Sequence, residues 1–255
     1  MLLLTSAGRR FTPGKNAKCR AWLRADRGFD PGQADNAIAP NWRSQVAGGA
    51  DCAQTNPLKA PIWHASGGLN NRPYLSFNGT QAYTWASDIS GSETIFMVFR
   101  ITTLPGGATP IYTLYSPKKS PDNTFCEYVV INAGGYKTTS FRFDYQAAGA
   151  SVGYDAALGT TNGHAVITTY NGGLNTSLGS YADTLDGSAQ TMAASSTFGR
   201  TPTDLGSIGA RLTSTQVISN GSICEMYEIA RYSPQLTASE YLPLVSYARS
   251  HYRTP

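Results

Sequence analysis

The most apolar stretch of the chain is ETIFMVFRI, residues 93–101. The apolar side chains of Ile95 to Phe99 do not alternate with polar ones, so the pattern predicts a central β-strand that is buried on both faces. The run is much shorter than the ~18 apolar residues that a membrane-spanning helix needs. We therefore expect a strand in the middle of a sheet, and no membrane partner.

Turn-forming pairs and further strand patterns lie on both sides of this stretch. A strand over residues 74–77 ends at Asn78-Gly79, and a long strand over residues 222–232 follows Asn220-Gly221. Thr237 and Glu240 form a capping box that predicts one terminal helix. Further strands are expected at 19–25, 82–86, 111–115, 125–131, 139–145, 163–170, 180–185 and 205–212. This pattern predicts an all-β fold, a two-sheet antiparallel sandwich with a short C-terminal helix.

Composition agrees with a β-rich chain of 255 residues. Charged residues make up 14%, below the roughly 25% of typical soluble domains, while Gly (26) and Tyr (15) are abundant. The length predicts one domain, residues 20–255, after a basic N-terminal arm, residues 1–19. The one dense basic cluster lies in this arm. A nucleic-acid binder carries a longer basic stripe, so we expect no nucleic-acid partner.

Cysteines and histidines do not form a metal-binding pattern. No two of the four cysteines form a Cys-x-x-Cys pair, so we predict no metal site and no cofactor. The cysteines either form disulfides, of a connectivity that sequence does not fix, or are buried free thiols. A Cys19–Cys224 pair is one of the possibilities. The loop aspartates Asp122, Asp155 and Asp183 do not make the dense acidic loop that calcium prefers.

Seven segments, taken in order, are typical of one known superfamily. They are AWLRAD at 21–26, NWRSQ at 41–45, RPYLSFNGT at 72–80, ETIFMVFR at 93–100, GSIGA at 206–210, the strand at 221–232, and Leu236, Thr237 and Glu240 of the helix. The chain resembles, over residues 20–253, the concanavalin A-like, laminin-G-like jelly-roll superfamily of phage and bacterial surface proteins. The resemblance implies a lectin-like jelly roll, and a fold does not by itself name a function.

Catalysis is not expected. The superfamily includes laminarinase-type glycoside hydrolases, whose catalytic strand carries Glu, Asp and Glu at nearly alternate positions. The nearest pair here is Glu225 and Glu228, and a spacing of three places them on opposite faces of a regular strand. Residues 149–153 match Gly-x-Ser-x-Gly but lack the helix that must follow a nucleophile elbow.

A glycan-binding site is predicted from aromatic and amide side chains beside loops. Sugar rings stack on aromatic faces and donate hydrogen bonds to short polar groups. Tyr112, Tyr115 and Tyr136, with Asn132, are the candidates; ordinary packing of Tyr within a β-sandwich is the alternative for these rings.

Together these features predict a non-catalytic virion surface protein of phage, a capsid decoration or tail appendage that binds host or environmental glycans. It would be located in the virion, extracellular after release. The partners would be glycans, or a viral coat or tail protein that holds the N-terminal arm, and we expect a homo-oligomer. A free carbohydrate-binding module is the first alternative, and a glycoside hydrolase the less favoured one.

Overall fold

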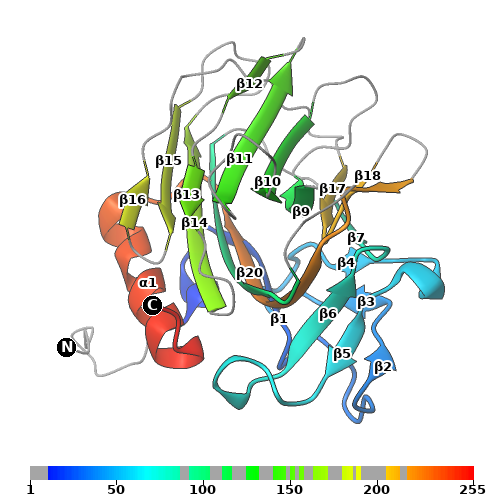
Figure 1. Cartoon of the computed structure of the whole chain (residues 1–255). Coiled ribbons are helices and arrows are strands. Elements are labelled where there is room, and N and C mark those ends of the chain that lie inside the picture. Colours follow the sequence, from blue (N-terminus) through cyan, green and yellow to red (C-terminus); the bar gives the residue numbers. More distant parts are fainter. Residues whose placement is uncertain are drawn as a thin grey trace.

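A computed structural model describes the chain over most of its length. The described residues are 11–86, 92–103, 111–116, 125–131, 140–147, 150–152, 155–157, 163–171, 180–185, 188–190, 205–212 and 217–255. Two antiparallel sheets pack face to face, and the C-terminal helix lies against the outer side of one of them (Figure 1). The predicted two-sheet antiparallel sandwich with a terminal helix is confirmed.

The first sheet has the order β16-β15-β14-β8-β20-β6-β5-β2, with β1 also paired to β20. Its strands are β1 (Cys19–Arg24), β2 (Ala37–Ile38), β5 (Ile62–His64), β6 (Tyr74–Asn78), β8 (Glu93–Ile101), β14 (Gly163–Asn171), β15 (Ser180–Leu185), β16 (Ser188–Gln190) and β20 (Ile223–Tyr232). One edge of β20 pairs with β8. Along its other edge, β20 pairs first with β6 and then with β1.

The second sheet has the order β12-β11-β10-β9-β17-β7-β4-β3, with β13 also paired to β11. Its strands are β3 (Asn41–Trp42), β4 (Cys52–Ala53), β7 (Tyr83–Ala86), β9 (Ile111–Ser116), β10 (Phe125–Ile131), β11 (Ser140–Ala147), β12 (Ala150–Val152), β13 (Asp155–Ala157) and β17 (Leu205–Ile208). The remaining elements are the short pair β18 (Arg211–Leu212) and β19 (Ile218–Ser219) and the 3₁₀ turns η1 (Pro13–Lys15), η2 (Pro57–Lys59) and η3 (Leu69–Asn71).

Strand β8 is buried on both faces, as its apolar run predicts. Ile95, Met97 and Phe99 belong to the core between the sheets, whereas Phe96 and Val98 belong to a second core on the outer face of the first sheet. Successive side chains of a strand point to opposite faces, so an apolar run without alternation fills both cores.

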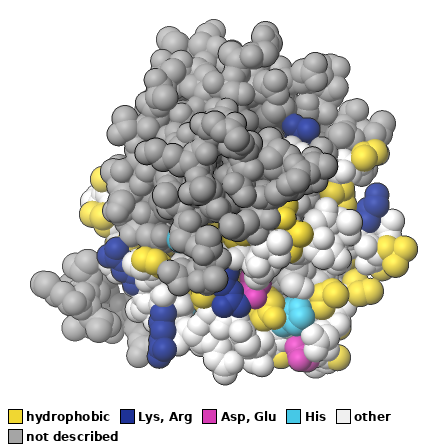
Figure 2. Space-filling model, viewed as in Figure 1, with side chains coloured by type: hydrophobic (Ala, Val, Ile, Leu, Met, Phe, Trp, Pro, Cys, Tyr) yellow, Lys and Arg dark blue, Asp and Glu magenta, His cyan; other side chains and the backbone are white. Residues whose placement is uncertain are grey.

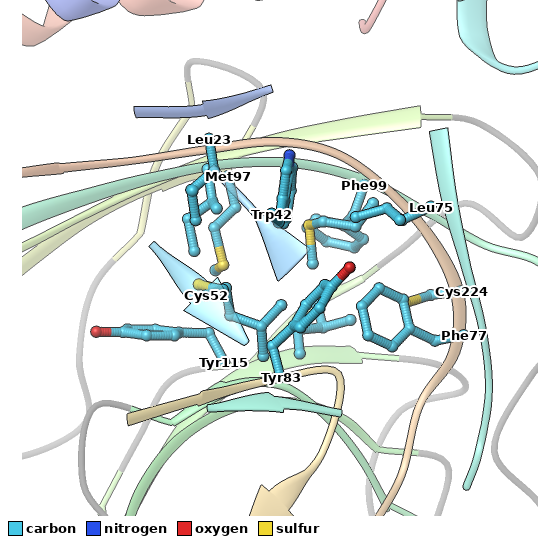
Figure 3. Packing of buried hydrophobic residues seen from close by; sticks show 14 of the residues in the cluster. Leu23, Trp42, Cys52, Leu75, Phe77, Tyr83, Met97, Phe99, Tyr115 and Cys224 are labelled. Carbon is cyan, nitrogen blue, oxygen red and sulfur yellow. The ribbon is translucent and has the colours of Figure 1, made fainter. Parts of the chain in front are cut away.

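The core between the sheets is rich in large aromatic side chains (Figure 3). Trp42 and Tyr83 are fully buried, and the Tyr83 hydroxyl donates to the Ala39 carbonyl at 2.5 Å. Trp42 comes from the long segment between β1 and β5, and the Trp63 indole donates to the Ala25 carbonyl at 2.7 Å. Both tryptophans therefore fix this Gly- and Pro-rich segment to the body of the domain, and it carries the short strands β2, β3 and β4.

Helix α1 (Ala238–Tyr252) covers part of the outer face of the first sheet. Its capping box forms as predicted: the Thr237 amide donates to the Glu240 carboxylate at 2.8 Å. Leu244, Val245 and Ala248 pack into the second core.

Part of the predicted N-terminal arm lies against this helix and β1. Lys18 forms an ion pair with Glu240 at 2.6 Å, and the Phe11 ring meets Tyr247 edge-on. Residues 1–10, with Arg9 and Arg10, lie outside the described residues.

Three cysteines are buried free thiols: Cys19, Cys52 and Cys224. Cys19 pairs in register with Tyr232, at the opposite end of β20 from Cys224. Eight strand residues span about 26 Å, so these two thiols cannot form a disulfide. The free-thiol alternative is correct for these three, and the side chain of Cys126 lies outside the described residues.

Candidate functional site

Two of the predicted binding residues lie in the core between the sheets. Tyr112 is 5% exposed and Tyr115 is 1% exposed, and the Tyr115 ring packs edge-on against Trp85. Neither ring offers a face to a ligand. Both rings take part in ordinary packing within the β-sandwich, which is the alternative given for them above. Tyr136 and Asn132 lie outside the described residues. The site must therefore be built from other side chains.

A β-bulge in β20 changes which side chains share its outer face. Met226 is opposite Phe99 and Glu228 is opposite Val98, so Tyr227 is an extra residue in β20. A bulge of this kind breaks the strict alternation of side chains. The expectation that Glu225 and Glu228 lie on opposite faces is therefore wrong. Both carboxylates lie on the outer face, where Tyr227 OH contacts Glu225 and residues of α1 contact Glu228.

The outer face holds a row of directly opposed residues from four strands. Ile62 of β5 is opposite Ser76 of β6, Ser76 is opposite Glu225 of β20, and Glu225 is opposite Arg100 of β8. In the next row, His64 is opposite Tyr74. Five of these side chains are partly exposed and Glu225 is buried, and Tyr74 also packs against the second core. We call them the open patch: Ile62, His64, Tyr74, Ser76, Arg100 and Glu225.

An ion pair lies at the centre of the open patch. Arg100 Nη2 donates to Glu225 Oε1 at 2.6 Å, and the two side chains are 27% and 8% exposed. The hydrogen bond to Glu225 raises the pKa of Arg100 above its ordinary value. The second carboxylate oxygen of Glu225 accepts from the Tyr227 hydroxyl. Both carboxylate oxygens are thus held by protein donors, which fixes the position of the guanidinium at the surface.

Beside the ion pair lies a stacked pair of rings. His64 and Tyr74 have ring centroids 4.4 Å apart and an angle of 12° between their planes. His64 Nε2 is 2.9 Å from the Ser76 hydroxyl oxygen. Figure 2 shows a histidine on this face, over β5 and β6, with basic and acidic side chains near it. Flat rings beside a fixed polar group are the combination that sugar rings require.

The loop between β5 and β6 separates the open patch from the helix. The Tyr227 hydroxyl accepts from the Leu69 amide at 2.9 Å, and the Asn70 amide group donates to the His251 carbonyl at 3.0 Å. Gly68 lies so close to Tyr227 and Tyr74 that a Cβ there would come within 2.5 Å and 2.9 Å of their rings. Tyr227 therefore connects the loop to the ion pair.

Glu228 lies beneath the helix and is completely buried. Its carboxylate accepts from Trp22 Nε1 at 2.5 Å, from Tyr252 at 2.5 Å and from Tyr247 at 2.9 Å. Burial nevertheless raises the pKa of Glu228 from 4.5 to about 7, against the effect of these donors and of Arg24. Through these hydrogen bonds the carboxylate connects β20 with β1 and α1, so its role is structural.

Arginines next to the loop are also paired with a carboxylate. Arg24 Nη2 donates to Asp26 at 2.6 Å, and Arg72 lies 4.0 Å from the same carboxylate oxygen. Burial, and then the neighbouring arginines Arg72 and Arg24, lower the pKa of His251 to about 4.

The described residues contain no group of His, Cys, Asp and Glu side chains that could hold a metal ion. In the same part of the chain, no helix has the length and hydropathy to cross a membrane.

Sequence reasoning missed the open patch because the patch depends on pairing between distant strands. One signal was available: Tyr74 and Ser76 alternate with the buried Leu75 and Phe77, which marks the outer face of β6. The partners Arg100 and Glu225 are 125 positions apart in the sequence, and only the register of β8 and β20 brings them together.

Solved structures with the same architecture are numerous, although all of those reported below share little sequence with this chain. No protein-family model matches, and no curated protein matches. The receptor-binding domain of botulinum neurotoxin type G is 11% identical with a TM-score of 0.58, over 91% of this chain and 51% of that one. These likenesses show the fold. It is a two-sheet antiparallel β-sandwich.

Two further structures agree with this fold. Domain 4 of AbnA, an extracellular arabinanase from Geobacillus stearothermophilus, was solved in complex with arabinotriose; it is 12% identical with a TM-score of 0.54, over 89% of this chain and 98% of that one. A mutant of Trypanosoma rangeli sialidase is 15% identical with a TM-score of 0.58, over 90% of this chain and 33% of that one. The chain thus spans a third to a half of two of these proteins and nearly all of the arabinanase domain.

Proposed function

We propose that the chain is a non-catalytic glycan-binding module and that the open patch is its binding face. The observation that carries the proposal is the stacked His64–Tyr74 pair beside the Arg100–Glu225 ion pair on the outer face of the first sheet. The ring pair supplies apolar contact surface for the C–H groups of a sugar, and the fixed guanidinium supplies donors for its hydroxyl oxygens.

The fold of the structural neighbours supports this proposal. The matched arabinanase domain was solved with arabinotriose, and its whole length corresponds to this chain. The other two matches come from a receptor-binding domain and a sialidase. A fold that occurs in a receptor-binding domain and in a domain solved with arabinotriose is suited to binding a saccharide.

The environments of the two outer-face glutamates support the non-catalytic part of the proposal. A retaining hydrolase needs two carboxyl groups that both reach the scissile bond. Glu228 is completely buried beneath α1, and both oxygens of Glu225 are held by protein donors. Neither carboxylate is presented to a substrate in this arrangement.

A glycan array with the purified chain tests the proposal, followed by calorimetry on the strongest binder. Tyr74→Ala and His64→Ala should each weaken binding about three- to tenfold, because each removes one of the two rings that contact the sugar. Leu58→Ala is the matched control, since Leu58 is 83% exposed on η2, outside the open patch. Binding that survives both ring substitutions would refute this location for the site, and silence across the array would refute the function.

The virion location, with release to the extracellular space, stays a prediction from the sequence. So does attachment of the N-terminal arm to a coat or tail protein, and so does the homo-oligomer. Residues 1–10 hold the part of the arm outside the described residues. Deleting them should leave glycan binding intact and abolish particle attachment if the arm has this role.

A further inference from the structure

The charges around the open patch determine which class of glycan it can accept. Arg100 is the one arginine or lysine of the open patch, and its charge is offset by Glu225 at 2.6 Å. A second carboxylate is close: Asp35 Oδ1 accepts from the Ala65 amide, directly after His64, at 2.8 Å. The open patch and its border therefore hold two carboxylates for one guanidinium.

The electrostatic environment of the Tyr74 hydroxyl agrees with this count. Burial raises its pKa first, Glu225 and Asp35 raise it further, and Arg100 alone among the named charges lowers it. A negative group placed on the Tyr74 ring would meet the same two carboxylates.

On the other side of the β5–β6 loop the balance is the reverse, with two arginines for one carboxylate. Arg24 and Arg72 both face Asp26, at 2.6 Å and 4.0 Å. An acidic sugar bound at the open patch would meet a guanidinium whose charge Glu225 already offsets, and Glu225 is also fixed by Tyr227. Like charges at short range in a half-buried site are unfavourable.

We propose that the open patch selects uncharged saccharides and rejects those that carry a carboxylate or sulfate, and that Glu225 is the residue that sets this selectivity. The inference rests on the proposed function and adds the ligand class. Glu225 acts in two ways: it neutralises Arg100, and it repels an anion on the bound sugar. Hydroxyl groups of a neutral sugar can still accept hydrogen bonds from the exposed edge of Arg100, because they carry no charge that Glu225 would repel.

Matched pairs of ligands test the selectivity with the full chain. We would compare arabino-oligosaccharides and galacto-oligosaccharides with oligogalacturonates, and lactose with 3′-sialyllactose, by calorimetry at low and moderate salt. The expected result is binding of at least one neutral ligand, and binding of its acidic counterpart weaker by about tenfold or more at low salt. Equal or tighter binding of the acidic member would overturn the inference while leaving the glycan-binding function in place.

Substitution at Glu225 separates the two proposals. Glu225→Gln keeps the shape of the side chain and removes its charge, so affinity for the acidic ligands should rise about three- to tenfold at low salt, with a smaller change for neutral ones. The exposed pair Arg43–Asp30, at 2.5 Å, provides the control, and Asp30→Asn should change neither class. Unchanged selectivity in a folded Glu225→Gln protein would overturn the role of Glu225. No binding of any ligand would refute the proposed function itself.

Discussion

Glu225 and Glu228 are three positions apart on β20, yet both carboxylates lie on the outer face of the first sheet, because Tyr227 is an extra residue in the strand. The bulge gives the two carboxylates different environments. Glu225 is buried beside the partly exposed Arg100, whereas Glu228 lies under α1 with Trp22 and Tyr252. One strand thus supplies both the polar centre of the open patch and the group that fixes the helix.

The buried carboxylate makes stability depend on pH in a defined direction. The pKa of Glu228 is raised from 4.5 to about 7, so the folded state binds a proton more tightly than the unfolded state does. Its contribution to the free energy of unfolding is complete below pH 4.5, falls between 4.5 and 7, and is lost above 7. The loss amounts to roughly 3 kcal/mol at most.

Urea unfolding of the wild-type chain and of Glu228→Gln at pH 5, 6, 7 and 8 measures this effect. We subtract the free energy of unfolding of the variant from that of the wild type. This difference should be larger at pH 5 than at pH 8. Using the difference removes the opposite contribution of His251, whose pKa is lowered to about 4 and whose neutral form favours folding at higher pH. A difference that does not change with pH would contradict the assignment of Glu228.

Removing one donor to this carboxylate should destabilise the helix contact. Tyr252→Phe leaves the ring in the second core and removes the hydroxyl that donates to Glu228 at 2.5 Å. We expect a loss of about 1–3 kcal/mol at pH 8, where the carboxylate is charged, and a smaller loss at pH 5. An equal loss at both pH values would show that the hydroxyl does not act through the charge of Glu228.

The sandwich and its main elements could be predicted from the sequence, because each of them follows from residues that are close together in the chain. The unbroken apolar run at β8 specifies burial on both faces, and Thr237 with Glu240 specifies the start of α1. The open patch could not be predicted in this way. It requires the register of β5, β6, β8 and β20 together with the bulge at Tyr227, and none of these follows from residues that are close in sequence.

The tyrosines chosen from the sequence illustrate the same limit. Tyr112 and Tyr115 have aromatic rings of the kind that stack on sugars. A phenol ring suits a core equally well when its strand is central. Strand β9 lies between β10 and β17, and both rings are buried. Tyr74 is expected only as part of a strand. Its alternation with the buried Leu75 and Phe77 places it on the outer face of β6.

The contact between the β5–β6 loop and the open patch gives a further prediction. Gly68→Ala would bring a Cβ within 2.5 Å of Tyr227 and 2.6 Å of the Arg72 carbonyl, so the loop must shift. We expect a loss of about 1–3 kcal/mol in stability and weaker glycan binding, measured by thermal unfolding and calorimetry. Gly67→Ala, with φ +91° and open space around its Cβ, is the control for backbone strain alone and should retain affinity.

Thiol chemistry tests the arrangement of the cysteines. Cys19, Cys52 and Cys224 should resist alkylation in the native protein, because burial raises the pKa of each thiol. After unfolding without a reductant, all three should react, and peptide mass spectrometry would identify them. Detection of a Cys19–Cys224 disulfide would contradict the register of β1 on β20.

The most direct test of the binding face is amide chemical-shift mapping of the labelled chain, titrated with the neutral oligosaccharide that binds best. The account predicts that the largest shifts occur at His64, Tyr74, Ser76, Arg100 and Glu225, and that Tyr74→Ala needs about three- to tenfold more ligand to reach the same shifts. Shifts confined to the second sheet, or to residues around Tyr112 and Tyr115, would contradict the assignment of the open patch as the binding face.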